Sequence, residues 1–460
     1  MEKLTLKEII QAVDGEFLKE GKEVVYEAVS TDTRSIEKNS IFIALRGTNF
    51  NGNDYAVEAS KKGARVCIID ETAFRVEEFS DEVSVIKVKD TKQALLSLAE
   101  YYRSKLSIKV IGITGSTGKT STKDIVAAVL SSKYKVFKTK GNFNNEIGLP
   151  LMIFKLDNEY DVAVLEMGMS NFGEIHNLAK TAKPDIAIIT NIGVSHIEFL
   201  KSRENILKAK MEITDFFESN NSLIINSDND LLKGLNNLTF NLIKIGTEAE
   251  NIDFKADEIV LKEDSINFRI IDKHGFESPE FTVNIPGKHN VLNTLLAVAC
   301  GKLLGLSYEQ MIEGVENLEF TSMRLDIVKG SKFTIIDDSY NASPDSMKAA
   351  IDVLLNFKGN RKIAILGTMK ELGNMSYELH KDIGRYAKEK DIDLLIVSGE
   401  FAEAYIKGFE DTKKVFSFED NERICDFLKN YIEKDDVILV KASRSMKFEK
   451  IVNNLKVINS

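Results

Sequence analysis

One short segment limits what this chain can fold into more than any other: residues 112–120 read Gly-Ile-Thr-Gly-Ser-Thr-Gly-Lys-Thr. A β-branched run, Ile108–Thr114, leads into it, and Lys119–Leu130 continues with apolar residues at helical spacing. A strand, a glycine-rich turn and a helix in this order turn backbone amides and a helix N-terminus toward a phosphate group. The segment therefore predicts a phosphate-binding loop in which Lys119 reaches the β- and γ-phosphates and Thr120 ligates Mg²⁺.

Other interpretations of this segment stay open. Its spacing departs from the commonest phosphate-loop pattern, because Ile113 stands five residues before Gly118 and the available glycines are Gly112 and Gly115. A purely structural turn is therefore one alternative. A phosphate-binding loop alone also fits a GTPase, a kinase, an ATPase or a ligase. The chain contains no Asn-Lys-x-Asp sequence, which argues against the base-recognition loop of a GTPase.

Three further side chains are candidates for a metal site near this loop. Glu166 ends the apolar run Val162–Leu165, and His196 follows the run Ile186–Ile189. Ligands of open α/β sheets bind at the carboxyl ends of the strands, which places both residues at the expected edge. Glu166 could equally cap the next helix, and His196 could be an ordinary surface or core residue. Spacing alone makes Lys210 a solvated lysine on a helix.

The order of apolar runs predicts an α/β protein with three domains. A chain of 460 residues, at roughly 150 residues per domain, has room for about three cores. We expect a small mixed domain over residues 1–104, a central domain with a mostly parallel sheet over 105–318 and a C-terminal Rossmann-like domain over 319–460. Strands are expected at Ser40–Leu45, Ala64–Ile69, Val162–Leu165, Ile186–Ile189, Leu223–Ile225, Phe333–Ile336, Lys362–Leu366, Leu394–Val397 and Val437–Val440, with alternating strands over Ile252–Ile285 and helices at Ala56–Lys62 and Asn290–Leu304.

Composition limits the classes of partner and the kinds of site that this chain can have. Sixty-one Lys and Arg against 71 Asp and Glu give a net charge of −10, which argues against nucleic acid as the main partner. Three widely separated cysteines, Cys67, Cys300 and Cys425, fit neither a disulfide framework nor a zinc knuckle. The first residues carry no apolar signal segment, and no apolar stretch approaches the ~18 residues of a membrane span. We therefore expect a cytoplasmic protein.

Besides the glycine-rich loop, Glu166 and His196, the chain contains the segments Asn142–Gly148, Asp337–Met347 and Lys441–Met446. Together these motifs resemble the Mur ligases, which are ATP-dependent amide-bond ligases of peptidoglycan precursor synthesis, and hence of cell-wall growth, cell shape and cell division. The resemblance extends over all three expected domains. It is carried in chain order by Gly115–Ser121, Asn142–Gly148, Glu166, Asn191–Glu198, Ala209–Glu212, Gly287–Asn290, Met323–Asp326, Asp337–Met347 and Lys441–Met446. In the last of these blocks Ala442 stands where the family frequently has glycine.

Within the family, the resemblance implies an enzyme that joins D-alanyl-D-alanine to UDP-N-acetylmuramoyl-tripeptide. Asn142–Gly148, Asp337–Met347 and Ser443–Met446 favour this activity. The alternative member adds the third stem residue and typically carries an Asp-Asn-Pro-Arg motif, which this chain lacks. Folylpolyglutamate synthases share the ATPase core but not the uridine-binding domain, which Thr31–Arg34 and Ala44–Gly47 resemble. A nucleotide-driven switch without ligase activity is the alternative from another class.

The resemblance also implies which residues bind each ligand. The uridine nucleotide is expected to bind to Thr33, Arg34, Arg46 and Gly47. The sugar or stem peptide is expected to bind to Asn142, Asn144 and Asn145. Ser443 and Arg444 belong to the same substrate-binding group. ATP is expected on Gly115, Ser116, Thr117, Gly118, Lys119, Thr120 and Ser121, with Asn290 reading adenine, Arg324 contacting phosphate or ribose and Asp338 accepting the ribose hydroxyls.

The implied metal centre uses two Mg²⁺ ions and a modified lysine. Thr120, Glu166 and His196 are the expected ligands, together with Lys210 carbamylated by CO₂, which turns a cation into a bridging anion. Lys119, Lys210, Glu166 and His196 form the expected catalytic set. The implied route activates the stem-peptide carboxylate as an acyl phosphate, which the amine of D-alanyl-D-alanine then attacks. We expect a monomer.

Overall fold

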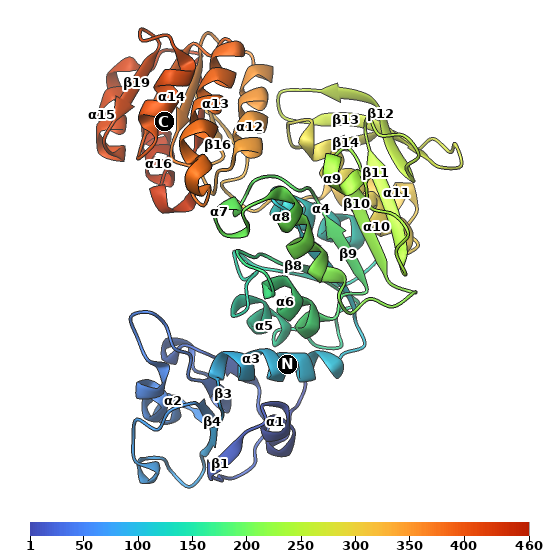
Figure 1. Cartoon of the computed structure of the whole chain (residues 1–460), viewed down its shortest axis with the longest axis vertical. Helices are drawn as coiled ribbons and strands as arrows, with labels where there is room; N and C mark the ends of the chain where they lie inside the picture. Colours follow the sequence, from blue (N-terminus) through green and yellow to red (C-terminus); the bar gives the residue numbers. More distant parts are fainter. Residues whose placement is uncertain (460) are drawn as a thin grey trace. The chain divides into compact units, whose positions relative to one another are not determined.

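The computed structural model describes residues 1–459, and its strands form three sheets (Figure 1). The chain divides into two compact units. One unit holds residues 1–113, 134–187 and 211–221, and the other holds residues 114–133, 188–210 and 222–460. The three cysteines are free thiols, and two of them are buried. Within residues 1–459 no helix is both long enough and apolar enough to cross a membrane.

The first sheet has five strands in the order β1-β5-β4-β3-β2, all parallel except the β1–β5 pair. Its strands are β1 Glu16–Lys19, β2 Ala28–Ser30, β3 Ser40–Ile43, β4 Ala64–Ile69 and β5 Ser84–Lys87. The accompanying helices are α1 Leu6–Ala12, α2 Ala56–Lys62 and α3 Thr91–Ser104, with short 3₁₀ turns η1 Thr33–Ser35, η2 Gly52–Tyr55 and η3 Val76–Glu78. A capping box at Thr5 begins α1, and the Asp90 carboxylate accepts from the backbone N–H of Gln93 at the start of α3.

The second sheet has nine strands in the order β14-β13-β12-β11-β10-β9-β6-β8-β7. Its strands are β6 Lys109–Thr114, β7 Val136–Lys138, β8 Val162–Glu166, β9 Ile186–Ile189, β10 Ser222–Asn226, β11 Asn241–Gly246, β12 Phe254–Leu261, β13 Ile266–Asp272 and β14 Phe281–Val283. Parallel pairing of β6, β7 and β8, and of β10 with β11, gives way to antiparallel pairing over β12–β14. The change from parallel to alternating strands is therefore confirmed.

The helices around this sheet follow the strands in the alternation that parallel connections require. They are α4 Lys119–Ser131, α5 Gly148–Ile153, α6 Glu174–Ala182, α7 Ile197–Leu200, α8 Arg203–Met211, η4 Glu212–Thr214, α9 Asp230–Lys233, α10 His289–Leu303 and α11 Tyr308–Glu316. The α4 and α10 helices pack against each other, and both are largely buried.

The third sheet has six strands in the order β15-β16-β20-β17-β18-β19, parallel except for β15. Its strands are β15 Asp326–Lys329, β16 Thr334–Asp337, β17 Lys362–Leu366, β18 Leu394–Ser398, β19 Val415–Phe418 and β20 Val437–Lys441. The helices are α12 Pro344–Asn356, α13 Ser376–Glu389, α14 Ala402–Phe409, α15 Asn421–Tyr431 and α16 Glu449–Asn459, with η5 Gly373–Met375 and η6 Arg444–Met446.

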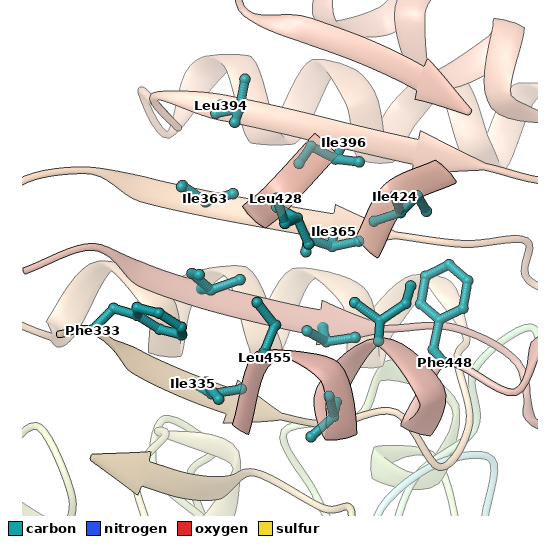
Figure 2. Close-up of a cluster of buried hydrophobic side chains, with 14 of the residues drawn as sticks. Phe333, Ile335, Ile363, Ile365, Leu394, Ile396, Ile424, Leu428, Phe448 and Leu455 are labelled. Carbon is teal, nitrogen blue, oxygen red and sulfur yellow. The ribbon is translucent and has the colours of Figure 1, made fainter. Parts of the chain in front are cut away.

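One face of the third sheet forms a hydrophobic core with α15 and α16. Figure 2 shows Ile363, Ile365 and Ile396 on the strands beside Ile424 and Leu428 on α15. Burial of such side chains stabilises the domain by roughly 1.5–3 kcal/mol each. This core fixes the strand ends from which the site loops emerge.

The α3 helix connects the first sheet to the second through buried hydrogen bonds. The Arg103 guanidinium donates to the carbonyls of Ala182, Leu106 and Ile108 at 2.9–3.0 Å. The Tyr102 hydroxyl donates to the carbonyl of Leu156 at 2.5 Å. Although the predicted domain boundary follows α3, this helix also packs on α5 and α6.

The predicted elements agree well with the structure. The strands Ala64–Ile69, Ile186–Ile189 and Lys362–Leu366 and the helix Ala56–Lys62 have the predicted bounds, and the other predicted strands differ by one or two residues at their ends. The α/β class is confirmed. The domain bounds at 104 and 318 stay a prediction.

Candidate active site

The phosphate-binding loop lies between β6 and α4, as predicted. Gly115 has φ +152° and Gly118 has φ +78°, so the turn uses backbone conformations that glycine adopts at low cost. A methyl group on Gly115 would lie 1.8 Å from the Thr190 hydroxyl oxygen. The Lys119 ammonium donates to the Gly115 carbonyl at 2.8 Å, which folds this side chain along the loop. Thr120, 5% exposed, lies in the first turn of α4 between Lys119 and Ser121.

The segment after β9 holds the phosphate-binding loop in place. The Ser116 N–H donates to the Asn191 carbonyl at 3.0 Å, and the Thr117 N–H donates to Asn191 Oδ1 at 2.9 Å. The Thr190 hydroxyl donates to the Thr117 carbonyl, and the Gly193 N–H donates to Ser116 Oγ. The sequence placed this segment at the correct sheet edge but did not single out Asn191. The sequence feature that could have identified Asn191 is the Thr-Asn pair directly after a buried strand.

A buried chain of side chains connects α10 to the phosphate-binding helix. Asn290 is fully buried, donates to the Pro286 carbonyl at 2.8 Å and accepts from Asn293 at 2.9 Å. Asn293 Oδ1 in turn accepts from the Thr122 hydroxyl at 3.1 Å. Asn290 therefore fixes α10 against α4, and its reading of adenine stays a prediction.

Glu166 lies at the end of β8, as predicted, and only 3% of it is exposed. Its Oε1 accepts from Asn144 Nδ2 at 2.8 Å, and its backbone N–H donates to the Thr139 hydroxyl at 3.0 Å. The structure thus brings together two residues that the sequence had assigned to different ligands, one to metal and one to substrate.

His196 immediately precedes α7 with φ +65°, an uncommon conformation for a residue with a side chain. Its Nδ1 lies 2.5 Å from Oε2 of Glu371, a residue in the loop after β17 that also has φ +65°. Contact with His196, and at longer range the charge of Lys119, hold the pKa of Glu371 below its ordinary value against the opposing effect of burial. No sequence pattern pointed to Glu371, because it lies in a different domain from His196.

Lys210 is 1% exposed, so the expectation of a solvated helix lysine is wrong. In α8 the residues Ile206, Ala209 and Lys210 are all buried, whereas Lys208 is exposed. The spacing i, i+3, i+4 from Ile206 places Lys210 on the inward stripe of the helix, and this was the signal in the sequence. Burial, with a smaller effect from the charge of Lys119, lowers the pKa of Lys210 well below its ordinary value.

The strand ends of the third sheet hold the predicted nucleotide residues Asp338 and Arg324. Asp338 forms an ion pair with the buried ammonium of Lys441, which also donates to the Asn341 carbonyl at 2.9 Å. Burial lowers the pKa of Lys441, and Asp338 counteracts that effect. The Arg324 guanidinium lies 4.4 Å from the centre of the Tyr340 ring.

Ser443 and Arg444 lie at the same edge, after β20. The Ser443 N–H donates to the Thr368 carbonyl at 3.1 Å, and its hydroxyl oxygen accepts from the Lys370 N–H at 2.9 Å. Arg444 pairs with Glu449 at 3.0 Å, and its guanidinium lies 6.0 Å from the centre of the Tyr340 ring. One tyrosine ring therefore has both predicted arginines, Arg324 and Arg444, within cation–π distance.

The predicted uridine residues lie in two loops of the first sheet. We call Arg46–Asn51 the uridine loop; in it, Arg46 donates from two nitrogens to Asp70 at 2.9–3.0 Å, and the Gly47 N–H donates to the Phe50 carbonyl. Although burial acts in the opposite direction, hydrogen bonds from Arg46 and Asn53 hold the pKa of Asp70 below its ordinary value.

Thr33 and Arg34 form the other part of the predicted uridine site. They lie in η1, where the exposed Arg34 guanidinium pairs with Asp32. Asp32 also accepts from the backbone N–H of Arg34 at 2.9 Å, which begins this turn. Their contact with the nucleotide stays a prediction.

We call Asn142–Gly148 the stem-peptide loop. Asn145 Oδ1 accepts from the Gly148 N–H at 2.8 Å and from the Ile147 N–H at 3.2 Å, so this residue shapes the entry into α5. The carbonyl of Asn142 accepts from the Asn144 N–H at 2.8 Å. Their substrate contacts stay predictions.

Comparisons with known proteins agree with this geometry. Three family models match: "Mur ligase family, catalytic domain" at residues 25–103, "Mur ligase middle domain" at 113–301 and "Mur ligase, glutamate ligase domain" at 323–444. The chain is 39% identical over 462 residues to UDP-N-acetylmuramoyl-tripeptide–D-alanyl-D-alanine ligase of Bacillus subtilis, covering 99% of both chains. The Escherichia coli ligase of the same name is 32% identical, with 98% of each chain covered.

Solved structures show the same fold. A MurF crystal structure from Acinetobacter baumannii has a TM-score of 0.89 at 30% identity and covers 99% of both chains. A MurF ligase from Thermotoga maritima in complex with ADP has a TM-score of 0.83 at 30% identity, covering 94% of this chain and 97% of that one. The three-domain α/β architecture predicted from the sequence is therefore confirmed.

Proposed function

This chain belongs to the Mur ligase family, and from the relatives that match its whole length we infer that it joins D-alanyl-D-alanine to UDP-N-acetylmuramoyl-tripeptide in peptidoglycan synthesis. It is an ATP-dependent carbon–nitrogen ligase. The observation that carries this conclusion is the match of all three domains to ligases of this one specificity, at 32–39% identity over 98–99% of the chain. The sequence prediction of this activity is confirmed, and the third-residue ligase and the switch are set aside.

The nucleotide phosphates fit the loop before α4. Its glycines allow the backbone amides to turn toward a phosphate, Lys119 supplies a cation, and Asn191 holds the loop in its curled form. Asn290, Arg324 and Asp338 are assigned to the nucleoside, and Gly115–Ser121 to the phosphates. Ser443 and Arg444 are assigned to the substrate at the edge of the third sheet.

Two of the assigned donors, the Thr120 hydroxyl and the Glu166 carboxylate, are oxygen ligands of the kind that Mg²⁺ prefers and combines with substrate phosphates. Within residues 1–459, His, Cys, Asp and Glu side chains form no group of three that could hold a metal ion. Thr120, Glu166 and His196 are assigned as protein ligands, with carbamylated Lys210 for a second ion. When bound, the metal supplies positive charge that offsets charge on the transferred phosphoryl group.

Carbamylation of Lys210 is supported by its surroundings. CO₂ adds to the neutral amine, and the lowered pKa of this buried lysine raises the neutral fraction at pH 7. A carbamate is an anion, so it also turns the repulsion between Lys210 and Lys119 into attraction. The hydrogen bond from Asn144 orients the Glu166 carboxylate, and the Thr139 hydroxyl holds the Glu166 backbone.

The reaction follows from these assignments in two steps. A stem-peptide carboxylate oxygen bonds to the γ-phosphorus as the bond to the bridging oxygen of ADP breaks, giving an acyl phosphate. The amine of D-alanyl-D-alanine then attacks the acyl carbon, loses a proton, and phosphate leaves. Lys119 stabilises the phosphoryl group in the first step, and Asn142, Asn144 and Asn145 orient the peptide. We place this reaction in the cytoplasm, where ATP and UDP-linked precursors are made, and assign a monomer.

The test is a product assay by mass spectrometry. The protein receives ATP, Mg²⁺, D-alanyl-D-alanine and UDP-muramoyl tripeptides that differ in their third residue. We expect a pentapeptide product, ADP and phosphate, and the preferred tripeptide identifies the third residue. Product from a muramoyl dipeptide and a free diamino acid, with none from the tripeptide, contradicts the proposal.

A further inference from the structure

The first turn of α3 contacts the stem-peptide loop directly and the segment that leads into the uridine loop. Thr91 is 2% exposed. Its hydroxyl donates at 2.9 Å to the carbonyl of Ala44, which lies two residues before the uridine loop. The next residue, Lys92, forms an ion pair with Glu146 of the stem-peptide loop. Two neighbouring side chains thus contact the residue that leads into the uridine loop and the stem-peptide loop itself, and these two loops lie about a hundred residues apart in the chain.

Glu146 holds the stem-peptide loop from two sides. One carboxylate oxygen pairs with Lys92 on α3, and the other, Oε1, accepts from Asn177 Nδ2 on α6 at 2.7 Å. The Glu146 side chain is 15% exposed and that of Lys92 is 50% exposed, so water partly screens the ion pair. Two residues earlier in the loop, Asn144 donates to Glu166 at 2.8 Å. The contacts of Glu146 therefore hold the loop two residues away from Asn144.

The uridine loop is fixed to the same helix turn. Asp70 accepts from Arg46 in the loop and from Asn53 Nδ2 at 2.8 Å, and its Oδ2 lies 3.4 Å from the Thr91 hydroxyl. The far end of α3 is held by the buried hydrogen bonds of Tyr102 and Arg103. The helix is thus a spacer between the two loops: Lys92 contacts the stem-peptide loop directly, and Thr91 contacts the uridine loop through Ala44 and Asp70.

We propose that Lys92 and Glu146 are positioning residues that fix the separation of the uridine loop and the stem-peptide loop, so that one substrate molecule engages both. The inference rests on the proposed function, because it takes a UDP-linked muramoyl peptide as the ligand. A substrate held at two ends gains affinity from the second contact only while the two half-sites keep the matching distance. A change in that distance weakens the binding of the whole substrate and leaves each half-site intact.

The test uses Lys92→Met, Glu146→Gln and the double variant. Each single change removes the ion pair, while glutamine keeps an oxygen for Asn177. We expect the KM for UDP-N-acetylmuramoyl-tripeptide to rise roughly two- to fivefold, the range for losing a partly exposed pair. The KM for ATP and the inhibition constant of UDP alone should stay unchanged, because neither ligand spans the two loops. In the double variant the KM for UDP-N-acetylmuramoyl-tripeptide should rise no more than in either single variant.

A matched control lies at the other end of the same helix. Glu100→Gln removes the 3.1 Å ion pair between α3 and Lys183, just after α6, without touching either loop. It should leave all three constants unchanged. Thermal unfolding confirms that each variant is folded.

Three results overturn the proposal: an unchanged KM for the UDP-linked substrate, a parallel rise in the inhibition constant of UDP, or additive effects in the double variant. Calorimetric titration of the UDP-tripeptide with ATP omitted gives the same comparison without turnover. A wild-type protein that binds this substrate but forms no pentapeptide contradicts the proposed function and leaves the positioning test intact.

Discussion

At the scale of single residues, burial decides what a lysine can do. An ammonium group removed from water is destabilised unless it gains a counter-charge or loses its proton. Lys210 is buried near the charge of Lys119, and both effects lower its pKa. Lys208, two residues earlier on the same helix, is exposed. The two lysines therefore differ in chemistry although the sequence around them looks like one basic stretch.

This difference gives the first prediction. Lys210→Ala should remove most ligase activity, at least roughly 10²-fold, the scale for losing a preorganised charge at the reacting phosphate, whereas Lys208→Ala should change little. Activity of the wild type should fall when CO₂ and bicarbonate are removed and recover when bicarbonate returns. With ¹³C-labelled bicarbonate, NMR should show a carbamate signal that Lys210→Ala lacks. Equal activity of the two variants contradicts the carbamate assignment.

His380 gives a prediction for stability against pH. Burial lowers its pKa to about 4 from an ordinary value of 6.5, while its Nε2 accepts from the Met369 N–H at 2.8 Å and its Nδ1 donates to the Ser376 carbonyl. The unfolded chain therefore takes up a proton below pH 6.5, and the native state does so only below about pH 4. This difference destabilises the protein as pH falls through that window, by up to about 3 kcal/mol.

The His380→Gln variant should therefore have a lower free energy of unfolding than the wild type at pH 7. Between pH 7 and pH 4 its free energy of unfolding should fall less than that of the wild type. Urea unfolding at several pH values, followed by a probe in the C-terminal domain, measures the effect. His274→Gln, at an exposed turn, is the control and should follow the wild-type curve. A variant curve parallel to the wild type shows that His380 does not titrate in this window.

At the scale of elements, the turn before α4 depends on Gly115. Its φ of +152° disfavours a side chain, and an added methyl would lie 1.8 Å from the Thr190 hydroxyl oxygen, which itself supports the loop. Gly115→Ala should weaken ATP binding roughly tenfold or more, since strain of this kind costs on the order of 1–3 kcal/mol. Calorimetric titration with ATP measures it. Gly234→Ala, where no atom lies closer than 3.6 Å, should bind ATP like the wild type.

The elements were also the part of the structure that the sequence predicted best. Parallel strands covered on both faces are continuous apolar runs, so Ile186–Ile189 and Lys362–Leu366 could be bounded from sequence alone. The contacts between loops could not. Asn191 supports the phosphate-binding loop through side-chain geometry, and Glu371 reaches His196 from a different domain. Local sequence carries no record of such long-range pairs. The burial of Lys210 was missed for another reason: its spacing was interpreted as that of a solvated lysine, although Lys210 lies one helical turn after the buried Ile206.

At the scale of the whole molecule, the assigned ligands are distributed over three domains. The uridine loop belongs to the first sheet, the phosphate-binding loop to the second, and Asp338, Ser443 and Arg444 to the third. An acyl phosphate hydrolyses readily in water, so an enzyme that forms one gains from keeping the first step unproductive until all substrates are present. A nucleotide-driven switch has no such requirement.

Phosphate release should therefore depend on all three substrates together. With ATP and Mg²⁺ alone, or with either the UDP-tripeptide or D-alanyl-D-alanine added singly, we expect release at a small fraction of the complete rate. The complete mixture should release one phosphate for each pentapeptide, because every acyl phosphate that forms is consumed by the amine. A coupled phosphate assay run beside chromatography of the UDP-linked product measures both quantities. Rapid ATP hydrolysis without peptide, or phosphate in large excess over pentapeptide, would show that nucleotide hydrolysis in this chain is not coupled to ligation.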